Sequence, residues 1–240
     1  MNPLANLTID AHGGLDRWKQ FDKVSAHLVQ GGAIWQLKGQ AGTLDETNVT
    51  VGLRREWASH SPFGTVASRS QFQPPGRVAL EAADGTVLKE LLQPRASFAN
   101  HTLQTPWTDL QLAYFAGCAM WTYLNMPFLL AWPGVVCEEL SLWKENGENW
   151  RRLAVQYPAD IATHSTKQTL YVDEAGLLKR HDYDVEIAGN TAGAHYIDDY
   201  VEVSGIMFPT RRRIFSRLPD ASVNRDPLVV SIDLSNIQLS

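Results

Sequence analysis

The residues best suited to chemistry lie in the segment from Leu177 to Val203, which has a glycine-containing stretch near its middle. Alternating polar and apolar residues on both sides of that stretch predict a β-hairpin. A register that places Arg180 opposite Asp198 and Lys179 opposite Asp199 pairs opposite charges across the two strands. In that register, one face of the hairpin carries His181, Tyr183, His195, Ile197 and Asp199.

This face admits several kinds of site. A histidine beside a tyrosine can orient a ligand at the polar end of an apolar pocket, or transfer a proton as general acid or base. His181 and His195 are the candidate catalytic residues, with Tyr183 assisting. A metal would need both histidines and a carboxylate such as Asp199, and we predict neither a metal nor a cofactor. In a purely structural interpretation, cross-strand hydrogen bonds satisfy the histidines.

The motifs of common enzyme families are missing. The sequence has no glycine-rich phosphate loop, G-x-S-x-G, H-E-x-x-H or C-x-x-C, which argues against the common nucleotide-dependent and hydrolase families. A formal net charge of −5 argues against a nucleic-acid partner. Whether the protein is an enzyme therefore stays open.

A long apolar stretch, from Gln111 to Cys137, interrupts a chain that otherwise alternates like β-strands. Thr105 and Pro106 suit a helix start, and Met126-Pro127 suits a stop, so we expect a broken helix inserted at about residues 106–132. Acidic flanks and the internal proline argue against a stable membrane span. The aromatic side chains of this region and a histidine before it are expected to contact a ligand, namely Trp107, Tyr114, Phe115, Trp121, Phe128 and His101. His181, His195 and Asp199 of the hairpin are expected to contact it as well.

The elements around this stretch are short. Two helices are expected near the N-terminus, over residues 3–12 and 15–21. Alternating runs then recur about every ten residues, as in antiparallel sheets and barrels. One of them, Ile34 to Lys38, is expected to be a strand that follows a Gly31-Gly32 hairpin turn. The Arg211–Arg213 run is expected to face solvent or to pair with acidic residues of the preceding strand.

Four short motifs resemble those of bacterial lipoprotein-sorting-like proteins of the LolA, LolB and LppX type. They are AHGGLDRW at 11–18, TLYVDEAGLLKR at 169–180, GIMFPTR at 205–211 and SIDLSNIQ at 231–238. The resemblance implies an open β half-barrel whose concave side is filled by helices and whose cavity binds acyl chains. An export signal and a lipid-anchored cysteine, which that family carries, are not expected from the sequence as it stands.

Together these observations predict a mainly β (α+β) protein with a single domain over residues 1–240. Its sheet is an antiparallel open half-barrel of about 11–13 strands around the central broken helix. The expected partner is a hydrophobic or lipid-like small molecule; the alternative is a cofactor-free enzyme that acts on such a molecule. The expected location is cytoplasmic as the sequence stands, or periplasmic if a signal peptide has been removed. The oligomeric state stays open.

Overall fold

A computed structural model describes residues 1–64 and 67–240, and one antiparallel sheet extends through most of it. The sheet has 14 strands in the order β6-β5-β4-β3-β2-β1-β14-β12-β11-β10-β9-β8-β7, and β13 pairs with β12 outside this path. The strand bounds are β1 Lys23–Gly31, β2 Glu46–Gly52, β3 Ala58–Ser61, β4 Ser68–Gln73, β5 Arg77–Ala82, β6 Val87–Leu92, β7 Val136–Glu145, β8 Glu148–Gln156, β9 Lys167–Val172, β10 Leu178–Val185, β11 Thr191–Val203, β12 Ile206–Arg217, β13 Val223–Asn224 and β14 Val230–Leu239.

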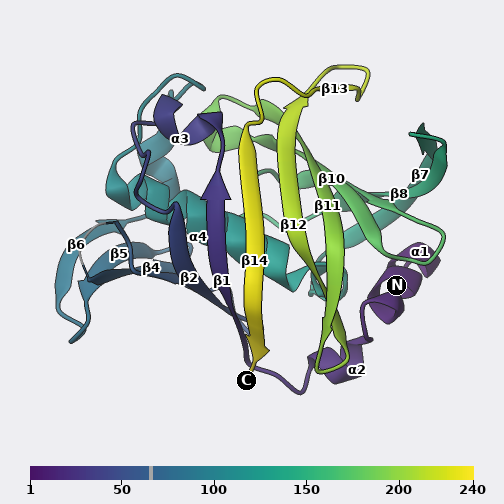
Figure 1. The fold of residues 1–240 in the computed structure, drawn as a ribbon, viewed down its shortest axis with the longest axis horizontal. Coiled ribbons are helices and arrows are strands. Elements are labelled where there is room, and N and C mark those ends of the chain that lie inside the picture. The colour runs from purple at the N-terminus through teal and green to yellow at the C-terminus, as the bar shows by residue number, and fades with distance from the viewer. Residues whose placement is uncertain (65–66) are drawn as a thin grey trace.

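The sheet is open, because its edge strands β6 and β7 do not pair with each other. The chain passes from one edge to the other through helix α4 (Asp109–Asn125), which crosses the concave side of the sheet (Figure 1). The last strand, β14, lies between β1 and β12 and so joins the two halves of the sheet. The predicted antiparallel open half-barrel around a central helix is confirmed.

Helix α4 begins three residues later than the sequence suggested. Thr108 is its N-cap: the Thr108 hydroxyl accepts a hydrogen bond from the Gln111 backbone N–H at 3.3 Å, and the Gln111 side chain accepts one from the Thr108 N–H at 3.0 Å. This reciprocal capping box satisfies two N–H groups that a helix start otherwise leaves unpaired. The end near Met126-Pro127 is as predicted, and a 3₁₀ turn, η2 (Phe128–Ala131), follows.

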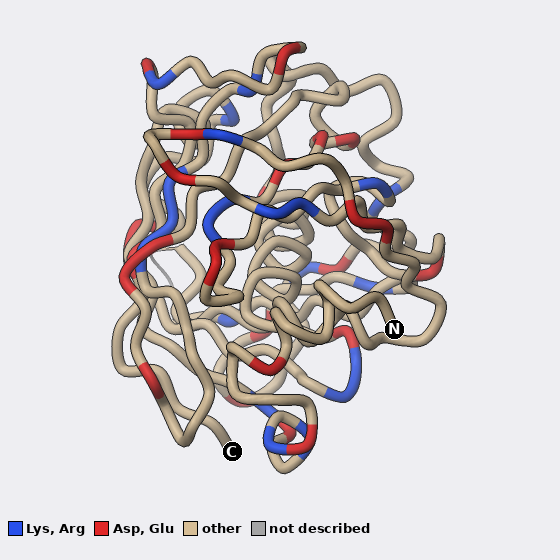
Figure 2. The backbone as a smooth tube through the Cα atoms, turned by 90° about the vertical axis from the view of Figure 1, so that its right-hand side faces the viewer, with Lys and Arg blue, Asp and Glu red and all other residues tan. Residues whose placement is uncertain are grey.

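Every residue of α4 from Gln111 to Asn125 is buried. The helical turns at the centre of Figure 2 are accordingly free of charged residues, which lie on the surrounding strands and loops. Gly117 allows the close approach of α4 to β4, because a Cβ atom at this position would lie 2.4 Å from the Cβ of Phe72. The helix is therefore a core element packed on the concave face of the sheet.

The short helices confirm one expectation and correct another. Helices α1 (Pro3–Ala11) and α2 (Leu15–Trp18) lie where the sequence predicted them. The prediction of a strand at 34–38 is wrong, because Ala33–Leu37 forms helix α3. Ile34 and Trp35 are adjacent and both buried, which a helical turn allows and a half-exposed strand does not. The remaining 3₁₀ turns are η1 (Pro94–Phe98) and η3 (Glu186–Ala188).

Candidate functional site

A largely apolar pocket lies between α4 and the concave face of the sheet. Its free volume is about 70 Å³. Helix α4 forms one wall and strands β10, β11, β12 and β14 form the other, while α3 and the segment before α4 cover a further side, which we call the mouth. None of the described residues that line it is charged; they are Gln30, Ile34, Trp35, Leu103, Trp107, Phe115, Ala116, Ala119, Met120, Tyr123, Tyr183, Val185, Ala188, Thr191, Ala192, Gly193, Ile214, Phe215, Ser216, Val229, Val230 and Ile232.

Lys38, at the end of α3, joins the two parts of the mouth. Its buried ammonium donates hydrogen bonds to the carbonyls of Thr102, Leu103 and Thr105 at 3.1, 2.6 and 3.1 Å. It also lies 4.6 Å from the centre of the Trp107 ring, within the range of a cation–π contact. One side chain thus fixes the segment that contributes Leu103 and Trp107 to the pocket.

Beneath the apolar pocket lies a layer of buried polar side chains. The Tyr123 hydroxyl of α4 lies 2.5 Å from the Tyr183 hydroxyl of β10 and 3.0 Å from Nε2 of His164. The His164 ring also stacks on the Tyr183 ring, with 4.6 Å between their centres. We call this group the polar layer; its members are Tyr123, His164, His181, Tyr183, His195 and Arg212.

The two candidate histidines lie directly opposite each other. His181 of β10 pairs with His195 of β11, so the true register differs by two residues from the one that matched opposite charges. A two-residue shift leaves the side chains on the expected faces. Asp199 is the exception: it has a φ of +56° within β11, and its exposed carboxylate lies 3.7 Å from Arg211. The sequence placed Asp199 beside the histidines, and the structure does not.

The histidines of the polar layer are neutral at pH 7. Burial lowers the pKa of His164 to about 3. Burial also holds the pKa of His181 and His195 well below the usual range, and the Arg212 charge contributes to both shifts. The Nε2 atom of His181 lies 2.5 Å from the Gln168 side-chain oxygen, to which it can donate. These histidines can orient a neighbour by hydrogen bonding but hold no charge.

Arg212 corrects the expectation that the arginine run faces solvent or acidic residues. Its side chain points to the concave interior, where the guanidinium donates to the Tyr123 carbonyl at 2.9 Å and lies 3.4 Å from Nε2 of His195. The alternation of β12 carried the signal, because Phe208, Arg212 and Ile214 share a strand face and are all buried. Three consecutive arginines suggested an exposed segment, although Arg212 lies on the buried face of this strand.

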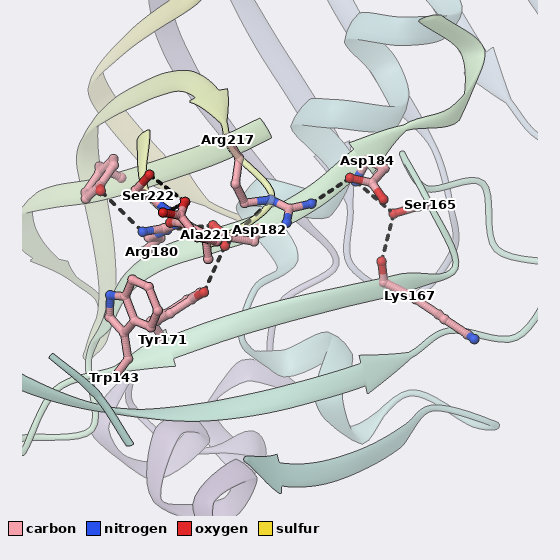
Figure 3. A network of polar contacts seen from close by, with 12 residues as sticks. Trp143, Ser165, Lys167, Tyr171, Arg180, Asp182, Asp184, Arg217, Ala221 and Ser222 are labelled. Atoms are coloured by element: carbon pink, nitrogen blue, oxygen red, sulfur yellow. Dashed lines mark hydrogen bonds and ion pairs between the residues drawn. The ribbon is translucent and has the colours of Figure 1, made fainter. Parts of the chain in front are cut away.

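The opposite face of the hairpin carries a separate ionic network. Arg180 forms ion pairs with Asp182 at 2.6 Å and with Glu145 at 3.0 Å, while Tyr171 donates to Asp182 at 2.9 Å. Arg217 extends the network to Asp184 (Figure 3). Acidic and basic groups are closely matched here, and we interpret this face as structural.

The predicted ligand-contacting residues divide into two groups. Trp107 and Phe115 line the pocket, and so does Tyr183, which the sequence suggested only as a residue that assists catalysis. His181 and His195 lie beneath it without reaching its free space. The sequence did not indicate the small and aliphatic residues that face the aromatic ones, such as Ala116, Ala119, Ile214 and Ile232. Their positions depend on the register between α4 and the sheet, which is not a local property.

The other predicted contacts are placed elsewhere in the core. The Trp121 indole donates to the Gly52 carbonyl at 2.9 Å, and Tyr114 packs on Phe72 on the side of the helix away from the pocket. Phe128 stacks on Trp18, with 4.1 Å between ring centres. His101 packs against Phe98. None of these four predicted residues lines the pocket.

A solved structure shares this architecture at low sequence identity. A LolA superfamily protein from Nitrosomonas europaea superimposes with a TM-score of 0.52 at 11% identity, over 98% of this chain and 92% of that chain. The chain has a LolA-like fold. A DUF1329 family protein from Desulfovibrio piger and a putative outer membrane lipoprotein-sorting protein domain from Vibrio parahaemolyticus each give a TM-score of 0.47 at 12% identity, covering 99% of this chain and 92% and 91% of theirs.

No family model and no curated protein matches the sequence. Among the described residues, no helix is long and apolar enough to cross a membrane. The same part of the chain contains no group of three or more His, Cys, Asp or Glu side chains arranged to hold a metal ion.

Proposed function

We propose that the protein binds a hydrophobic or lipid-like small molecule between α4 and the concave face of the sheet. The observation that carries this proposal is the free space at that position, whose described lining is free of charged residues. Space next to a central helix is unusual in a protein interior, which is normally packed as densely as an organic crystal. An apolar ligand gains about 25 cal/mol for each Å² of apolar surface it buries.

The mouth of the pocket must open for such a ligand to enter. A free volume of about 70 Å³ is smaller than the cavity of roughly 150 Å³ that takes up benzene. Helix α3 and residues 101–107 are the parts best suited to move, because they cover the pocket without belonging to the sheet. Lys38 holds them together and so controls the opening.

Binding of a neutral fluorescent probe, 1-aminoanthracene, tests the proposal. Ala119→Leu places a larger side chain in the free space, and we expect it to weaken probe binding at least about tenfold while the unfolding free energy is unchanged or higher. Ala83→Leu, on the exposed turn between β5 and β6, is the matched control and should bind like wild type. Absence of probe binding by wild type, or equal binding by Ala119→Leu, would contradict the proposal.

The enzymatic alternative has no observation in its favour. Tyr183 reaches the free space, but His181 and His195 do not line it. Their lowered pKa values also make them weak bases near neutral pH. We therefore keep ligand binding as the single proposed function.

A further inference from the structure

Arg212 is a buried cation for which the protein supplies no anion. Its side chain is 2% exposed, and among the described residues no carboxylate oxygen lies within 4.0 Å of it. The guanidinium makes one good hydrogen bond, to the Tyr123 carbonyl, and a longer contact with His195, while its Nε has no partner. Burying a charge without a counter-charge is costly.

The second deeply buried arginine of the sheet shows how this chain normally compensates such a charge. Arg180 is 0% exposed, and Asp182 and Glu145 contact it at 2.6 and 3.0 Å. The difference between the two arginines is therefore in their partners and not in their burial. Arg212 is surrounded instead by neutral tyrosines and histidines, so the polar layer has one uncompensated positive charge.

The polar layer is continuous with the pocket. Tyr123 and Tyr183 line the free space, and their hydroxyls belong to the layer. Ile214, which also lines the free space, lies two residues from Arg212 and therefore on the same face of β12. Two further atoms of the layer, Nδ1 of His164 and Nδ1 of His195, are buried without a hydrogen-bond partner. Unused hydrogen-bonding capacity and positive charge thus coincide at one end of an apolar pocket.

We propose that the polar layer binds the carboxylate of an amphipathic ligand whose apolar body fills the pocket. This inference rests on the proposed function and narrows its ligand class to monocarboxylates with an apolar chain. A carboxylate accepts several hydrogen bonds and matches the geometry of a guanidinium. The Tyr123 and Tyr183 hydroxyls, which now contact each other, then donate to the carboxylate, and Arg212 neutralises it.

Octanoate and 1-octanol, measured by displacement of 1-aminoanthracene at pH 7, distinguish the outcomes. They have the same chain length and differ in charge at the head. We expect wild type to bind octanoate at least about tenfold more tightly, as charge-assisted hydrogen bonds are stronger than neutral ones. Arg212→Met should abolish this preference and retain 1-octanol binding. Arg211→Met, an exposed neighbour on β12, is the matched control and should keep the preference.

Each result bears on a different claim. Equal affinity of wild type for the two ligands overturns the carboxylate site and leaves the hydrophobic pocket standing. Displacement by neither ligand overturns both proposals. A preference for octanoate that persists in Arg212→Met shows that another group binds the head and also overturns the assignment. If Arg212→Met does not fold, the relative affinity of wild type for octanoate and 1-octanol still tests whether the pocket has a carboxylate site.

Discussion

The hydroxyl of Tyr123 on the central helix lies 2.5 Å from the hydroxyl of Tyr183 on β10, at the boundary between the apolar pocket and the polar layer. This contact links α4 to the sheet by a hydrogen bond in a region where most other contacts are apolar. Burial raises the pKa of both phenols, so both are protonated at neutral pH. One of them donates to the other, and His164 provides a second partner for Tyr123.

We expect Tyr123→Phe to destabilise the protein more than Tyr183→Phe. Tyr123→Phe leaves both the Tyr183 hydroxyl and Nε2 of His164 without a partner, whereas Tyr183→Phe leaves Tyr123 bonded to His164. From the usual cost of unpaired buried groups, Tyr123→Phe should lose about 2–3 kcal/mol of unfolding free energy and Tyr183→Phe about 1 kcal/mol. Urea denaturation of both variants and the double variant measures the coupling. Strictly additive losses would show that the two hydroxyls do not interact.

Stability should fall as the pH is lowered through the histidine range. Burial lowers the pKa of His60 from 6.5 to about 4. Between these values the unfolded chain binds a proton at His60 that the folded chain does not, so His60 alone lowers the unfolding free energy by about 1.4 kcal/mol for each pH unit of acidification, and the other buried histidines add to this slope. His60→Leu should reduce the pH slope by about one proton. Thr122→Ala, which removes a buried hydroxyl that donates to the Cys118 carbonyl, is the control and should lower stability equally at every pH. A slope unchanged in His60→Leu would refute the assignment.

The fold could be predicted because its signals are local. Alternation along each strand predicts an antiparallel sheet or barrel, and an uncharged stretch between β6 and β7 predicts α4. That the sheet is an open half-barrel was implied only by the resemblance to lipoprotein-sorting-like proteins. The helix start was misplaced because Thr105 and Thr108 are both suitable caps by residue type. Only the reciprocal bond with Gln111 distinguishes Thr108.

The site was less predictable because it depends on pairing between distant segments. The charge-matched register failed since Arg180 finds its acidic partners in Asp182 and Glu145 rather than across the hairpin. The sequence thus placed His181 and His195 on the correct face but not opposite each other. The burial of Arg212 contradicts the usual exposure of arginine, and only the alternation of its strand indicated it.

Removing the Lys38 ammonium should loosen the mouth of the pocket. Lys38→Met keeps an unbranched side chain but leaves the carbonyls of Thr102, Leu103 and Thr105 without this donor. We expect faster amide hydrogen exchange in residues 101–107, unchanged exchange in α4, and faster association and release of 1-aminoanthracene. Lys19→Met, at an exposed position, should behave like wild type. Unchanged exchange at 101–107 in Lys38→Met would refute this role.

Gly117→Ala tests whether the close contact between α4 and β4 sets the position of the helix. In an ordinary helix this substitution is stabilising by about 1 kcal/mol. Here the new Cβ lies 2.4 Å from that of Phe72, so we expect a net loss of about 1–3 kcal/mol in unfolding free energy, measured by urea denaturation. Gly76→Ala, where the added Cβ meets no atom within 4 Å, is the control and should change stability little.

The same substitution should also affect the pocket. To relieve the contact with Phe72, α4 must move away from β4 and toward the strands that line the free space, which reduces the volume beside Ala119. We therefore expect Gly117→Ala to bind 1-aminoanthracene more weakly than Gly76→Ala does. Destabilisation with unchanged probe affinity would mean that β4 yields instead of the helix, because the pocket then keeps its volume.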